Sequence, residues 1–272
     1  MALIPSLRCL AAVSATPQAG TTKALALPLD VADLEHAAKF FSPANLAEYW
    51  VAALNADESE DTLIWALQFC DLHANGQLTL TTFNELVARN YCRLLGVLNT
   101  PFKWIIAHLE TVIIAACRSG SLEALQCVIE STGYTAEAFE AASISNRRAA
   151  VHAAAFNGHA ATTRWILDWV GYTTEEARKN HGWLLGRCCS EGRTEVVQVL
   201  LEKFGYEPGD ISPWAFYNML ANGHVDLAGM IVAKLGLTQE FITASAAFGN
   251  PAAQLPPHLA DRFGIQVQDL IN

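Results

Sequence analysis

The chain has 272 residues and a formal net charge of −10, and 52% of its residues are hydrophobic while only 16% are charged. This composition excludes an intrinsically disordered chain, and the length suits one large domain or two modest ones. No apolar run reaches the roughly 20 residues of a membrane span. The acidic balance disfavours nucleic acid as a partner, because negative charge repels phosphate backbones.

The seven cysteines are odd in number and irregularly spaced, with no C-x-x-C pair. Several stand at apolar helical positions, where a free thiol behaves as a small hydrophobe, so a reducing compartment, the cytoplasm, is predicted. Residues 1–29 contain no acidic residue and many Ala, Ser and Thr residues. We interpret them as an N-terminal arm, and an organellar transit segment is the alternative.

The stretch "LQFCDLHANGQLTLTTFNELV", residues 67–87, resembles an EF-hand calcium loop that begins at Asp71 and turns at Gly76. His73 at the third position and Thr82 in place of the closing Glu remove oxygen ligands that calcium requires. We therefore predict a metal-free helix pair and no cofactor. The alternative is that Ala74-Asn75-Gly76-Gln77 is another copy of a glycine turn that recurs farther along the chain.

That recurring turn organises residues 104–272. Each turn glycine is followed by a second glycine, and the pairs are Gly120 and Gly133, Gly158 and Gly171, Gly192 and Gly205, and Gly223 and Gly236. The spacing within a pair is the same in all four copies, whereas the spacing from one turn glycine to the next varies. The constant interval predicts a rigid helix of about three turns that ends at a left-handed glycine.

A shorter helix rich in small residues precedes each turn, as in Ala153-Ala154-Ala155 and Cys188-Cys189. Each unit is then a helix–turn–helix that cannot bury its apolar face alone, so the copies are predicted to stack into a solenoid. The prolines Pro251, Pro256 and Pro257 break the last copy, as expected at the end of such an array.

Two blocks, "VHAAAFNGHAATTRWIL" and "LGRCCSEGRTEVVQVLLEKFG", resemble ankyrin repeats. His152 matches the first histidine of the family pattern, and His159 and His224 match the second. The resemblance implies that His152 serves structure through hydrogen bonding. It also implies a module that binds protein partners.

The sequence departs from the family pattern in two ways. No copy has the Thr-Pro opening, and polar stretches such as Thr173–Lys179 replace the hairpin between units. Thr173 followed by Glu176 is a helix N-cap signal, which predicts an extra helical turn there. Binding is therefore expected on the concave inner-helix face and not at hairpin tips.

No nucleotide-binding or hydrolase motif occurs. Cys188-Cys189 could be a nucleophile or metal-ligand pair beside His152 or His181, but two small inner-helix residues are the simpler interpretation. Trp165 and Trp169, one helical turn apart, are interpreted as solenoid core, with a partner anchor as the alternative.

We therefore predict an all-α fold, an ankyrin-like helical solenoid (104–272) with a helical N-terminal region (30–103) after the arm (1–29). The predicted function is a non-enzymatic adaptor that binds a protein partner, without a cofactor, metal or membrane span. The expected partner-binding residues on the inner-helix face are Arg118, Phe156, Asn157, Arg187, Glu191, Asn218 and Asn222. The alternatives are a fixed structural subunit of a large assembly and an enzyme with a Cys/His site.

Overall fold

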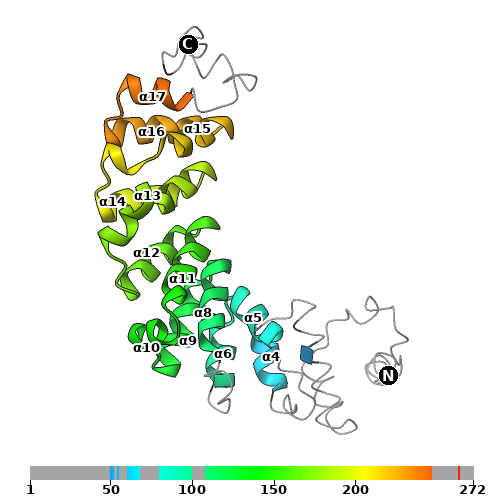
Figure 1. The fold of residues 1–272 in the computed structure, drawn as a ribbon. Helices are drawn as coiled ribbons and strands as arrows, with labels where there is room; N and C mark the ends of the chain where they lie inside the picture. Colours follow the sequence, from blue (N-terminus) through cyan, green and yellow to red (C-terminus); the bar gives the residue numbers. More distant parts are fainter. Residues whose placement is uncertain are drawn as a thin grey trace, which may run out of the picture. The chain divides into compact units, whose positions relative to one another are not determined.

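The computed structural model describes residues 50, 51, 54, 60–67, 80–99, 108–246 and 263. These residues form helices, and no strand occurs among them (Figure 1). The predicted all-α helical solenoid is thereby confirmed. The chain divides into one compact unit of residues 1–112 and 126–132 and a second of residues 113–125 and 133–272.

The first unit contains α4 (Glu60–Ala66), α5 (Leu80–Ala88) and α6 (Cys92–Asn99). Trp50 is fully buried in it, and its indole N–H donates a hydrogen bond of 2.9 Å to the Leu63 carbonyl. Thr82 is buried within α5. The predicted EF-hand-like loop runs from Asp71 to Thr82, and its residues 71–79 lie outside the described residues. The loop stays a prediction, as do the predicted domain boundaries.

The helices α8 (Leu109–Ser119) and α9 (Leu122–Thr132) contribute to both units. The remaining helices of the second unit are α10 (Ala136–Ala142), α11 (Ile144–Phe156), α12 (Ala160–Trp169), α13 (Thr174–Ser190), α14 (Thr194–Phe204), the short 3-10 helix η1 (Pro208–Asp210), α15 (Pro213–Ala221), α16 (Val225–Leu235) and α17 (Gln239–Ala246). The inner helices α11, α13, α15 and α17 pack in sequence, and α12, α14 and α16 form a second row (Figure 1). Each inner helix and the outer helix that follows it, α11 with α12, α13 with α14 and α15 with α16, form the predicted helix–turn–helix.

All eight repeat glycines adopt a positive φ, between 56° and 84°. Gly205 and Gly236 are the left-handed caps of α14 and α16, as predicted for the second glycine series. The constant interval between paired glycines is therefore the length of one outer helix together with its two left-handed ends.

The turns stack directly on one another. A Cβ atom at Gly120 would overlap the imidazole of His159, and one at Gly192 would overlap the imidazole of His224. His159 Nε2 hydrogen-bonds to the Arg118 carbonyl at 2.9 Å. Each of these turn glycines thus leaves room for a ring from the next turn, and the His159 ring also satisfies a carbonyl at the end of the preceding inner helix.

The turn at Gly158 uses an arginine in the same place. Arg193 donates from Nε to the Phe156 carbonyl at 2.7 Å, and its side chain lies over Gly158. At each of these turns, a side chain from the next turn, either histidine or arginine, therefore packs against the turn glycine.

The connections between units are helical, as predicted from Thr173. Its hydroxyl accepts a hydrogen bond from the Glu176 amide, and the Glu176 carboxylate accepts one from the Thr173 amide, which is a complete capping box. Arg147, from α11, pairs with both Glu140 and Glu176 and is only 15% exposed. The Arg147 guanidinium therefore links α11 to the connections before and after its repeat, at Glu140 and Glu176.

A left-handed turn that the sequence analysis did not anticipate interrupts α13. Asn180, His181 and Gly182 have φ values of 55°, 53° and 57°. A Cβ at Gly182 would overlap the Asp210 carbonyl oxygen, so the backbone passes very close to η1 here. The turn separates the connecting helical segment from the inner half of α13, which begins at Trp183.

Substitution of Gly192 by alanine is expected to destabilise the protein by about 1 kcal/mol more than substitution of Gly223, because it adds a steric overlap. Both replacements place a methyl group at a positive φ, which costs about 1–2 kcal/mol, but only Gly192 lies beneath a described ring, that of His224. Chemical denaturation of both variants measures the difference. Equal destabilisation would contradict turn stacking, and removing the ring with His224→Ala should abolish the difference.

Candidate functional site

Two tryptophans stand out on the inner helices of the second unit. Trp183 is 50% exposed and Trp214 is 53% exposed. Trp183 precedes Gly192 by the same interval at which Trp214 precedes Gly223, so the two rings occupy equivalent positions in adjacent repeats. Large exposed rings at matching positions are candidates for a contact surface, because burying them yields a large apolar gain.

Trp183 extends an aromatic cluster on α11. The His152 and Phe156 rings are stacked with centroids 5.0 Å apart, and Trp183 meets both edge-on, at 5.0 and 5.5 Å. His152 makes no hydrogen bond to the described residues, so its expected hydrogen-bonding role is replaced by ring packing. Burial, and secondarily the charge of Arg148, lowers the pKa of His152 below its ordinary value of 6.5, which keeps the ring neutral at pH 7.

A hollow of about 170 Å³ lies between α13 and α15. Trp183 and Trp214 line it, and Gly186 allows the two helices to approach closely, since a Cβ there would lie 2.9 Å from the Cβ of Ala215. One turn farther along, Arg187 joins the lining. The hollow thus combines two exposed indoles with a guanidinium.

The predicted partner-binding residues fall into two groups. Arg187 and Asn218 line the hollow, and Glu191 pairs with Arg187, with Nε and Oε1 2.6 Å apart. Asn222 is exposed at the same end and donates from Nδ2 to the Ser190 carbonyl at 2.7 Å. These four residues form a contiguous strip along α13 and α15.

The other three predicted residues lie on earlier repeats. Phe156 belongs to the aromatic cluster, and Asn157 is exposed but uses Nδ2 to cap the Ala153 carbonyl at 2.7 Å. Arg118 is exposed at the end of α8. The structure therefore places all seven on inner helices or their turns, and it adds Trp183 and Trp214, which the sequence analysis missed.

The tryptophan pair on α12 has a different setting. Trp165 and Trp169 are half-buried and stacked with centroids 5.8 Å apart, and Trp169 also contacts the buried Phe139 of α10 at 5.5 Å. These contacts support the interpretation of the pair as solenoid core.

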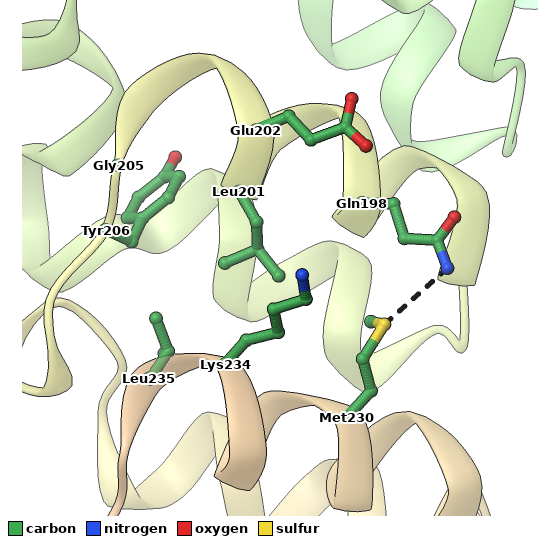
Figure 2. A pocket seen from close by; sticks show the side chains of 8 residues that line it. All are labelled: Gln198, Leu201, Glu202, Gly205, Tyr206, Met230, Lys234 and Leu235. Atoms are coloured by element: carbon green, nitrogen blue, oxygen red, sulfur yellow. Dashed lines mark hydrogen bonds between the residues drawn. The ribbon is translucent and has the colours of Figure 1, made fainter.

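A larger hollow, of about 440 Å³, lies between the outer helices α14 and α16 (Figure 2). Gln198 donates to the sulfur of Met230 across it at 3.6 Å, and the Glu202 carboxylate points away from Lys234 (Figure 2). Glu202 pairs instead with Arg164 of α12. The polar groups here do not converge on one point, and the half-exposed indoles lie on the inner helices, so the inner face is the better candidate.

The cysteine pair is poorly suited to chemistry. Cys188 and Cys189 are fully buried, and burial raises the pKa of Cys188 to about 12 and that of Cys189 still further. A reactive cysteine needs a thiolate near neutral pH and access to solvent. Within the described part of the chain, no cluster of three or more His, Cys, Asp or Glu side chains is arranged to hold a metal ion.

Residues 112–211 match the family model of ankyrin repeats, in three copies. No curated protein and no solved structure matches the chain. Together with the stacked helix–turn–helix units, the match shows that this region consists of ankyrin repeats. Ankyrin repeats are in general modules for protein–protein interaction, and the family is in general non-enzymatic. None of the described helices has the length and apolarity to cross a membrane.

In the folded protein, we expect Cys117, Cys188 and Cys189 to resist alkylation by iodoacetamide near neutral pH, because all three thiols are buried and their pKa values are raised. In denaturant they should react at the rate of free cysteine. Mass spectrometry of timed digests measures both rates. Rapid labelling of Cys188 or Cys189 in the folded protein would revive the enzyme hypothesis.

Proposed function

We propose that this protein is a non-enzymatic adaptor that binds a protein partner through the inner-helix face of its second unit. The observation that carries the proposal is the pair of half-exposed indoles, Trp183 and Trp214, beside Arg187. Tryptophan and arginine are the residue types that most often dominate binding energy at protein interfaces. Both indoles already stand exposed at fixed repeat positions.

The supporting scaffold is rigid where the surface lies. The turn stacking fixes the register of α11, α13 and α15, and Gly186 sets the close approach of α13 and α15. A surface that is ordered before binding loses less entropy on association. The buried free thiols fit a reducing compartment, so we place the adaptor in the cytoplasm.

We expect Arg187→Glu to reduce capture of the partner about tenfold or more, because it removes a guanidinium from the centre of the strip and adds a carboxylate next to Glu191. The matched control is Arg164→Glu. Arg164 is also about half exposed and also pairs with one glutamate, but it lies on the outer helix α12. Tagged wild-type and variant chains are compared by quantitative mass spectrometry of proteins captured from the native source.

Circular dichroism melting checks that both variants are folded. Equal loss of partners with Arg187→Glu and Arg164→Glu, or loss with Arg164→Glu alone, would contradict an inner-face site. The size of the captured complex then separates a transient adaptor from a fixed subunit of a large assembly.

A further inference from the structure

The charges of the second unit are unevenly divided between its helices. The inner segments, residues 113–119 of α8, α11, residues 183–190 of α13, and α15, carry Arg118, Arg147, Arg148 and Arg187 and no carboxylate. The described acids of this unit lie on the outer helices, on the connections and at the turns, apart from Glu240 near the start of α17. The four inner segments therefore carry only positive formal charge, with Glu191 at the end of α13, although the chain as a whole has a net charge of −10.

These arginines are only partly neutralised. Arg147 is paired with Glu140 and Glu176, but Arg118 and Arg148 are exposed and form no ion pair with the described residues. Arg148 precedes His152 by four residues on α11, so the two residues lie one helical turn apart.

Arg187 shares its carboxylate. Glu191 lies 2.6 Å from Arg187 Nε and 3.8 Å from Arg193 Nε, so one acid serves two guanidinium groups. Glu191 contacts Arg187 at Nε, so the two terminal amino groups of Arg187 can donate hydrogen bonds to a further acceptor. Carboxylates and phosphates are the acceptors whose geometry suits these groups.

The hollow that Arg187 lines also has an apolar part. Trp183, Trp214, Gly186 and Ala215 form that part, in a space of about 170 Å³ whose remaining lining is polar. That space suits one large apolar side chain, which would bury indole surface that is now in water.

From this arrangement we infer that the inner face takes an acidic peptide segment, with a large apolar side chain between Trp183 and Trp214 and a neighbouring carboxylate on Arg187. This inference rests on the proposed function and specifies the partner chemistry. A single-stranded nucleic acid also combines negative charge with rings that stack on tryptophan. The small number of cationic groups here favours the peptide, because nucleic-acid affinity depends on neutralising many phosphates.

A phage-displayed library of random dodecapeptides, panned on the full chain, tests the inference. We expect enrichment of peptides in which Leu, Phe, Trp or Pro is flanked by Asp or Glu. A synthetic peptide of the enriched sequence should bind about tenfold more weakly to Arg187→Glu and to Trp214→Ala, and within about twofold of wild type to Arg164→Glu. Exchanging the peptide's acid for lysine should restore binding to Arg187→Glu.

The contrary outcomes separate the two proposals. Peptides that need Trp214 but carry no excess of acid, or that bind Arg187→Glu as well as wild type, would overturn the acidic-segment inference and leave the inner-face site standing. Peptides bound equally by every variant would contradict both. An absence of enrichment, or tighter binding of a short oligouridylate than of any peptide, would overturn the inference.

Discussion

The stacking of each turn on the next is the contact on which the second unit depends. Gly120 and Gly192 have no side chain because a ring from the following repeat occupies that space, and His159 satisfies a carbonyl of the preceding repeat. Arg193 makes the corresponding contact at Gly158. Since each repeat contacts mainly the repeats before and after it, these turn contacts set the spacing between successive repeats.

The constant spacing of the repeats decides which residues are neighbours on the inner face. Trp183 and Trp214 are equivalent positions of adjacent repeats, and the residues one helical turn farther along, Arg187 and Asn218, are equivalent as well. Stacking in a constant register therefore places equivalent residues of adjacent repeats next to each other on the inner face. Aromatic residues then lie beside aromatic residues, and polar residues beside polar residues.

Much of this architecture could be predicted from the glycine intervals, because a left-handed residue at a helix end leaves a strong mark on the sequence. The connection at Thr173 was predictable for a similar reason, since a capping box is a local pattern. The exposure of Trp183 and Trp214 could not be predicted in this way, because an apolar residue in a helical sequence is normally taken as part of the core. Their equal distance from Gly192 and Gly223 was the one sequence feature that linked them.

Two other features depend on contacts that local patterns do not report. The left-handed turn at Asn180 and His181 lies close to η1, which follows α14 in the sequence. His152 matches a family position, yet here it packs on Phe156 and Trp183 and makes no hydrogen bond to the described residues. In both cases the tertiary neighbour decides the role of the residue.

We propose that the inner helices, and not the outer ones, form the binding surface. Hydroxyl-radical footprinting of the protein alone and in its complex purified from the native source tests this most directly. We expect strong protection of Trp183 and Trp214 in the complex, with unchanged oxidation of Met230 between α14 and α16. Protection of Met230 with both tryptophans still reactive would contradict it.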